Sequence, residues 1–210
     1  MSFINITDYF NNSDINVPGA QLETSGNFDI AITQYEPEIL KKLLGSVLYT
    51  LLIADLDESG NPQSQIYTAL VDGAEFSFDL NGKTVNTKWN GLRNDQHISL
   101  IAYYVYFNER SQNENFYSNY GQVQSIGENS TKVDITPKLI NVWNKMIDLY
   151  GVTPNYIFQN LRSPVEYYLE QGNYRHYNPL PSAYNFLLAN IDDYPTWVFE
   201  PIEYKNIYGI

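Results

Sequence analysis

Few residues in this chain have the types and spacing that catalysis or metal binding requires. The two histidines, His97 and His176, are far apart in the sequence, and neither belongs to an HExxH, HxH or His/Asp cluster. A surface or hydrogen-bonded imidazole is the simpler interpretation of each. The chain has no cysteine, which excludes a disulfide framework, a thiolate nucleophile and every Cys-based zinc or iron–sulfur site. We therefore predict no catalytic residue, no metal ligand and no bound cofactor.

One acidic segment has part of the spacing of a calcium loop. Asp55, Asp57, Ser59 and Gly60 form the pattern D-x-D-x-S-G after an apolar segment. The twelfth position of such a loop is Ile66, where a calcium loop needs a bidentate Glu. An acidic turn that ends a helix is therefore the preferred interpretation.

A pair of carboxylates is the remaining route to an enzyme. Asp192 and Asp193 could act with Glu200 in acid–base catalysis, which leaves a carboxylate-dependent hydrolase as an open alternative. The chain contains no GxGxxG, GxxxxGK[ST] or GxSxG motif, so the common nucleotide-binding loops and the esterase elbow are excluded. We predict that the protein is not an enzyme.

Tyrosine is unusually frequent, with 19 residues of this type. Tyr offers a large amphipathic contact area at a low cost in side-chain entropy, and it is enriched at protein interfaces. Tyr103, Tyr104, Tyr106 and Phe107 fall within one predicted helix, where packing between helices is the simpler interpretation. Stacking on sugar rings is the other, and it leaves a carbohydrate- or surface-binding module as a second open alternative.

Composition and charge limit the class of protein. Of the 210 residues, 43% are apolar or aromatic, which excludes wholesale disorder. The formal net charge of −12 argues against binding to nucleic-acid phosphates or anionic lipid. The most apolar segment, Leu43 to Ala54, is shorter than the roughly 20 residues that a membrane span needs. The first basic residue is Lys41, so no signal peptide is expected, and the product is expected to be soluble and made in a cytoplasm.

The elements that would position these residues are mainly helical. Apolar pairs spaced by four predict a helix that opens at Pro37, and the strand–Asn81-Gly82–strand pattern of residues 75–87 predicts a hairpin that pairs Phe78 with Val85. The buried stripe of the helix that opens at Pro37 is expected to use Ile39/Leu40, Leu43/Leu44, Val47/Leu48 and Leu51/Leu52. Further helices are expected at Pro62 to Val71 with Ile66 and Leu70 inward, Asp95 to Ser111, Ser163 to Gly172, and from Ser182 onward. A helix is also expected from Pro137 to Tyr150, with Thr136 as its cap, Gly151 at its end and a core stripe of Leu139, Val142, Trp143, Met146 and Tyr150.

The predicted fold class is thus a small helical bundle with an inserted β-hairpin, a projecting loop and extended arms at both ends. Residues 1–30 are polar and form the expected N-terminal arm, which would fray or lie on a neighbour, so its removal should leave a folded core. Residues 31–191 form the helical core domain, with the polar segment 111–133 as the projecting loop. Residues 192–210 are rich in aromatic side chains and are expected to pack or dock as a C-terminal tail.

Several short segments occur in a distinctive order along the chain. They are Gln34-Tyr35-Glu36-Pro37-Glu38, Lys88 to Asp95 (KWNGLRND), Ser99 to Tyr106 (SLIAYYVY), Glu128-Asn129-Ser130, Leu139 to Met146 (LINVWNKM), Tyr184 to Leu187 (YNFL), Asp193 to Trp197 (DYPTW) and Asn206 to Gly209 (NIYG). Together they resemble virion proteins of tailed bacteriophages that infect Bacteroides-type bacteria, the crAss-like phages among them. More loosely, they are similar to the head–tail connector (adaptor) proteins that form a ring beneath the portal.

The resemblance implies a structural role in the neck of a virion. A ring of twelve copies would continue the DNA channel below the portal and join the capsid to the tail. Its partners would be further copies of itself, the portal protein and neighbouring connector or tail proteins, with no membrane involved. DNA would pass through the channel without specific binding, and the acidic charge suits this because it repels the phosphate backbone. The expected location is the virion neck, assembled in the cytoplasm of the bacterial host.

Overall fold

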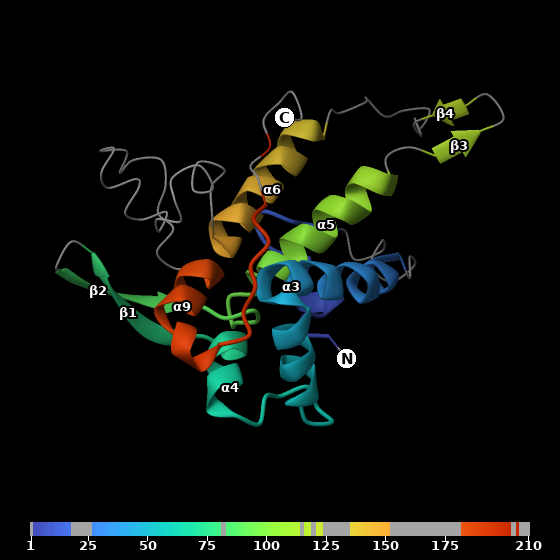
Figure 1. Cartoon of the computed structure of the whole chain (residues 1–210). Coiled ribbons are helices and arrows are strands. Elements are labelled where there is room, and N and C mark those ends of the chain that lie inside the picture. Colours follow the sequence, from blue (N-terminus) through green and yellow to red (C-terminus); the bar gives the residue numbers. More distant parts are fainter. Residues whose placement is uncertain are drawn as a thin grey trace.

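The protein is mainly helical and carries an antiparallel β-hairpin, as the sequence predicts (Figure 1). The computed structural model describes residues 2–17, 27–80, 83–113, 116–118, 121–123, 135–151, 182–202 and 205. The helices are α1 (Ile6–Tyr9), α3 (Asn27–Ala54), α4 (Gln65–Asp72), α5 (Leu100–Asn113), α6 (Thr136–Tyr150), α9 (Ala183–Ala189) and the 3-10 turn η1 (Ile191–Asp193). The strands are β1 (Ala74–Leu80), β2 (Lys83–Trp89), β3 (Phe116–Ser118) and β4 (Gly121–Val123).

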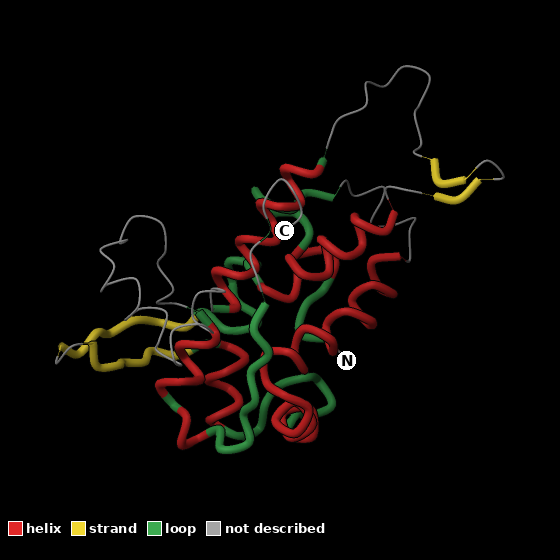
Figure 2. The backbone as a smooth tube through the Cα atoms, turned by 45° about the horizontal axis from the view of Figure 1, so that its top comes forward, coloured by secondary structure: helices red, strands yellow, loops and turns green. Residues whose placement is uncertain are grey.

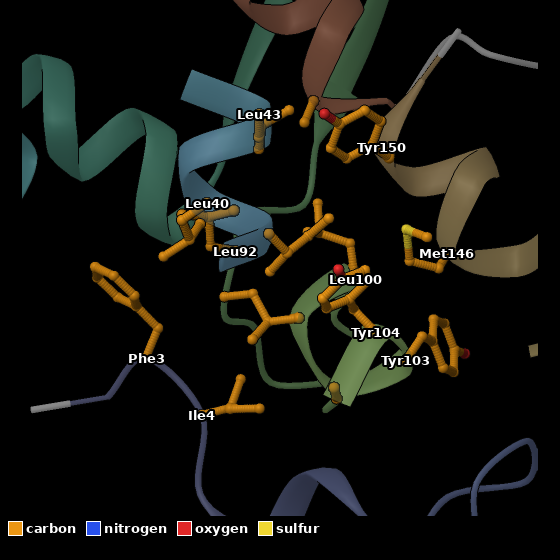
Figure 3. Close-up of a cluster of buried hydrophobic side chains, with 14 of the residues drawn as sticks. Phe3, Ile4, Leu40, Leu43, Leu92, Leu100, Tyr103, Tyr104, Met146 and Tyr150 are labelled. Carbon is orange, nitrogen blue, oxygen red and sulfur yellow. The ribbon is translucent and has the colours of Figure 1, made fainter. Parts of the chain in front are cut away.

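Helix α5 is the centre of the bundle, because it packs against both α3 and α6. Every residue from Leu100 to Tyr106 is buried, so the first two turns of α5 are covered on all sides. Figure 3 shows Leu100, Tyr103 and Tyr104 among side chains from α3 and α6. A helix that is buried all round is typical of the middle of a packed core.

Helix α3 begins ten residues before the predicted start at Pro37. The reason lies in an apolar stripe that precedes the proline, made of Phe28, Ala31, Ile32 and Tyr35, all of which are buried. Burial of this stripe outweighs the single backbone hydrogen bond that Pro37 cannot donate. The prediction of the helix start was therefore wrong, although the predicted end before Asp55 is confirmed.

The helical conformation of α3 is interrupted at Gly45, where φ is 76° and ψ is 158°. Before the break, Ile39, Leu40, Leu43 and Leu44 are all buried. After it, Leu48 and Leu52 of α3 are buried in the core, and Tyr49 packs against it partly buried. Val47 and Leu51 are left outside, so the prediction that they belong to the core was wrong.

The start of α5 also differs from the prediction, since the helix begins at Leu100 and not at Asp95. The side chain of Asn94 accepts hydrogen bonds from the N–H groups of Gln96 and Ile98 and donates to the carbonyl of Ile98. This local turn competes with the helix for the same backbone groups. His97, predicted in the first helical turn, lies instead in this loop with a positive φ of 56°.

The N-terminal segment is built into the core. Residues 2–17 do not form the free extended arm that their polar composition predicts: Phe3, Ile4, Phe10, Ile15 and Val17 are buried, and α1 lies in this segment. The apolar residues are few but well placed, and the ring of Phe10 packs 5.0 Å from that of Phe28 in α3. In Figure 3, Phe3 and Ile4 lie below the core side chains Leu40 and Leu92. Residues 18–26 of the predicted arm lie outside the described residues.

The two hairpins lie at opposite ends of the molecule in both views (Figures 1 and 2). The predicted pairing of Phe78 with Val85 in the β1–β2 hairpin is confirmed. The base of that hairpin is anchored by Phe76 and Trp89, whose rings pack against Phe186 of α9. Within the predicted projecting loop 111–133, α5 continues to Asn113 and β3 pairs with β4. The rest of that loop, and the predicted helix from Ser163 to Gly172, lie outside the described residues.

Helix α6 ends at Tyr150 as predicted, begins at Thr136, one residue before the predicted start, and has the predicted core stripe. Leu139, Val142, Trp143, Met146 and Tyr150 are all buried, and Gly151 ends the helix with a φ of 104°. Thr136 does not cap α6 as predicted, because it already belongs to the first turn and Ile135 takes the cap position.

The inward face of α4 differs in part from the prediction. Leu70 faces inward as expected but Ile66 is 37% exposed, and Tyr67 and Val71 are buried in its place. Helix α9 starts where it was expected, and Ser182 caps it through its side chain, which accepts the N–H of Asn185.

The C-terminal tail packs on the core, as its aromatic content predicts. Trp197 and Phe199 form a cluster with Tyr184 of α9 and Tyr150 of α6, with ring centroids 4.8 to 5.4 Å apart for the pairs Tyr184–Trp197, Tyr184–Phe199 and Tyr150–Phe199. The hydroxyl of Tyr194 donates to the carbonyl of Ile66, which ties the tail to α4 as well.

Candidate interaction surface

The acidic turn after α3 uses its carboxylates to hold its own backbone. Asp57 accepts the N–H groups of Ser59 and Asn61, each at 2.8 Å, and these bonds lower the pKa of its carboxyl group. Asp55 accepts the N–H groups of Gln63 and Ser64 at 3.0 and 2.9 Å. This supports the interpretation as an acidic turn, and no cluster of three possible metal ligands occurs within the described residues.

Of the three carboxylates considered for catalysis, Glu200 is in an ion pair, and Asp192 and Asp193 are exposed. Glu200 forms an ion pair with Lys42 of α3 at 2.6 Å. Asp192 and Asp193 are exposed in the turn η1.

Of the two histidines, the structure describes only His97, and its contacts are structural. His97 stacks edge-on against Tyr9 with 5.4 Å between ring centroids, and its carbonyl accepts the side-chain amide of Asn12. His97 therefore connects the loop of residues 94–99 with the N-terminal segment. His176 lies outside the described residues.

The tyrosines of α5 serve packing, which was the preferred interpretation. Tyr103 and Tyr104 are 2% and 5% exposed, so neither presents a ring face to a sugar. Their hydroxyl groups donate to the carboxylates of Asp14 at 2.7 Å and Glu38 at 2.6 Å. Lys145 of α6 also bonds to Asp14, so one carboxylate joins the N-terminal segment, α5 and α6.

A polar cleft of about 530 Å³ lies where the N-terminal segment meets α4, β2 and the loop that follows β2. It is lined by Tyr9, Asp72, Lys88, Asn90, Arg93, Asn94, Asp95 and Gln96. Arg93 crosses its wall and donates to Asp72, to the side chain of Asn61 and to the carbonyl of Gly60. Because all of these bonds are made within the protein, the guanidinium of Arg93 is a structural part of the cleft wall.

A group of exposed apolar residues near the α3 break is the feature that sequence reasoning missed. Val47 and Leu51 are 58% and 45% exposed, one turn apart on α3 after the break. Val198 of the tail is 67% exposed, and its Cβ lies against the backbone of Gly45, two residues before Val47. We call Val47, Leu51 and Val198 the outer apolar group.

Hydrogen bonds hold the tail against the part of α3 that directly precedes the break. The N–H groups of Val198 and Glu200 donate to the carbonyls of Leu44 and Lys42, at 3.3 and 2.8 Å. The indole N–H of Trp197 donates to the carbonyl of Leu43 at 2.8 Å. These three carbonyls directly precede the break at Gly45, and each accepts a hydrogen bond from the tail.

Comparison with known proteins identifies no relative. No family model, no curated protein and no solved structure matches this chain. Within the part of the chain that the structure describes, no helix has the length and apolar character to span a membrane.

Proposed function

We propose that this protein is a structural virion protein that forms a ring in the head–tail connector beneath the portal. In this role it continues the DNA channel and joins the capsid to the tail. Its partners are further copies of itself, the portal protein and the neighbouring connector or tail proteins.

The observation that carries the proposal is the outer apolar group. Val47, Leu51 and Val198 expose branched apolar side chains to water, at 58%, 45% and 67%. Isolated exposed apolar residues are common, but here two of them are one helical turn apart and the third lies against Gly45, where the helix breaks. Burial of such side chains against another subunit is favourable by about 25 cal/mol for each Å² removed from water.

Two properties of the whole chain support the same role. The net charge of −12 suits a channel through which DNA must slide without adhering, because like charges repel along its whole length. The order of segments such as KWNGLRND and LINVWNKM resembles virion proteins of crAss-like phages.

Native mass spectrometry with negative-stain imaging of the same sample tests the proposal. We expect closed rings of about twelve copies, either for the protein alone or after addition of the portal protein of the same virus. A protein that stays monomeric at all concentrations, both alone and with the portal protein, contradicts the connector role.

A further inference from the structure

The face between α5 and α6 holds a lysine from the far end of the chain. The ammonium nitrogen of Lys205 lies 4.4 Å from the ring centroid of Phe107 in α5 and 4.4 Å from that of Trp143 in α6. The two rings are themselves in contact, with centroids 4.6 Å apart. A cation placed over two aromatic faces at this distance is attracted by both ring quadrupoles.

The backbone of Lys205 is recognised as well as its side chain. The side-chain oxygen of Asn144 accepts the N–H of Lys205 at 3.0 Å, and the side-chain nitrogen of Asn144 donates to the carbonyl of Lys205 at 3.1 Å. A single amide side chain thus satisfies both backbone groups of one residue. Such two-point bonding fixes the position of the lysine residue, because it holds the backbone while the aromatic rings hold the side chain.

Electrostatics distinguish this contact from an ordinary surface lysine. Within the described part of the chain, the ion pairs that form do not include Lys205. Partial burial between the rings lowers the pKa of its ammonium group, since the charged form loses water. The rings, and not a carboxylate, therefore compensate the ammonium for the water that it gives up.

We infer that Phe107, Trp143 and Asn144 form a binding site for a lysine residue of a peptide chain, and that Lys205 of the chain's own tail is its resident ligand. The site fits the narrow ammonium of lysine between two ring faces and reads the backbone of the same residue through Asn144. It anchors the tail beyond the aromatic cluster of Trp197 and Phe199. The inference does not depend on the ring proposal, because every contact that supports it lies within one subunit.

Trypsin provides a direct test on the full chain, because the enzyme must take the Lys205 side chain into its own pocket before it cleaves. Cleavage after Lys205 removes residues 206–210, which intact-mass spectrometry detects. We expect the wild-type protein to be cleaved there many-fold more slowly than a synthetic peptide of residues 199–210. Asn144→Ala and Phe107→Leu should each speed this cleavage several-fold, and Asn141→Ala, an exposed change on the same helix, should not. Wild-type cleavage as fast as that of the free peptide overturns the inference.

Chemical rescue tests the ligand class independently. Lys205→Ala leaves the two rings without their ammonium, and n-butylammonium chloride supplies it again as a free molecule. We expect the indole NMR signal of Trp143 to shift and saturate with n-butylammonium in the Lys205→Ala protein but not in the wild type, whose site is filled. An equal response to n-butanol, or no response to n-butylammonium in a variant with the wild-type melting temperature, overturns the assignment of a cation site.

Discussion

At the scale of single residues, Glu36 is the most unusual charged group of the described core. Its side chain is 5% exposed, and it accepts hydrogen bonds from the hydroxyl of Ser2 at 2.5 Å and from the N–H of Phe3 at 3.1 and 3.2 Å. Burial raises the pKa of Glu36 above its ordinary value of 4.5, although these hydrogen bonds act in the opposite direction. The hydrogen bonds of Glu36 therefore hold the start of the chain against α3, while the loss of water around the carboxylate is unfavourable for folding.

This geometry predicts a pH dependence of stability with a defined sign. Between pH 4.5 and the raised pKa, the folded chain binds more protons through Glu36 than the unfolded chain does. The contribution of Glu36 to the free energy of unfolding is thus greatest below pH 4.5 and is lost as the pH rises through its folded-state pKa. We expect Glu36→Gln to remove this decline, and to be at least as stable as the wild type at neutral pH because no charge is buried.

Urea denaturation at a series of pH values above 4.5 measures the effect, with Glu58→Gln in the exposed turn as the matched control. The same decline with pH in wild type and Glu36→Gln would show that another group is responsible.

Trp143 is a second residue whose role can be measured alone. It is 9% exposed, and its ring lies 4.6 Å from Phe107 and 6.0 Å from Tyr104. We expect Trp143→Ala to lower the free energy of unfolding by about 3–5 kcal/mol, as a large core truncation does. Chemical denaturation checks this, and Asn141→Ala on the same helix should stay within about 0.5 kcal/mol of wild type. A loss below about 1 kcal/mol for Trp143→Ala would contradict its place in the core.

At the scale of elements, the break in α3 and the C-terminal tail are one structural unit. Gly45 interrupts the helix, and the tail then donates to the carbonyls of Lys42, Leu43 and Leu44. A residue with a side chain is disfavoured at this φ, and a Cβ on Gly45 would lie 2.9 Å from the Cβ of Val198. The break therefore needs glycine for its backbone conformation and for the close approach of the tail.

Gly45→Ala tests this unit. We expect a loss of about 2 kcal/mol or more in the free energy of unfolding, from backbone strain of about 1–3 kcal/mol together with displacement of the tail. Chemical denaturation gives the energy, and Ser46→Ala at the next, exposed position is the control and should be close to neutral. If Gly45→Ala matched the control, α3 would be able to continue through the break without loss.

At the scale of the whole molecule, the N-terminal segment is part of the folding unit. Its side chains fill the space beside Leu40 and Leu92, and Asp14 joins it to both α5 and α6 (Figure 3). Partial burial opposes the ionisation of Asp14, but its bonds to Lys145 and Tyr103 outweigh this and lower its pKa.

Deletion of residues 2–17 should therefore unfold or strongly destabilise the protein. The expectation from composition alone was a folded core without this segment, and the burial of Phe3, Phe10 and Ile15 reverses it. Circular dichroism and thermal unfolding measure the outcome, with Asn11→Ala at an exposed site of the segment as a control that keeps the wild-type melting temperature. A cooperative transition near the wild-type temperature after the deletion would show that the segment is dispensable.

Assembly is the second prediction at this scale, and it rests on the proposed connector role. Replacing Val47 and Leu51 together by Ser should weaken or abolish ring formation while the melting temperature of the subunit changes little, because both side chains are exposed in the single chain. Native mass spectrometry compares the double variant with Thr50→Ala, an exposed change on the same helix. Rings of the double variant at the wild-type concentration would exclude these residues from the interface.

Local patterns were sufficient for much of the fold. The β1–β2 register followed from strict alternation around Asn81-Gly82, and the α6 stripe followed from apolar residues at helical spacing before Gly151. Such signals depend on residues close in the sequence, which is why they can be read without a structure. The absence of the common catalytic motifs is equally a property of the sequence.

Long-range packing decided the remaining features. The sequence determined that this chain is an acidic, aromatic-rich helical protein with a hairpin, because composition and periodicity are properties of neighbouring residues. Only the tertiary structure decided that the N-terminal segment belongs to the core, that Val47 and Leu51 face outward, and that Lys205 lies between Phe107 and Trp143. Each of these depends on contacts between segments tens of residues apart, and the free energy of such contacts is set by which surfaces meet and not by the residues beside them in the chain.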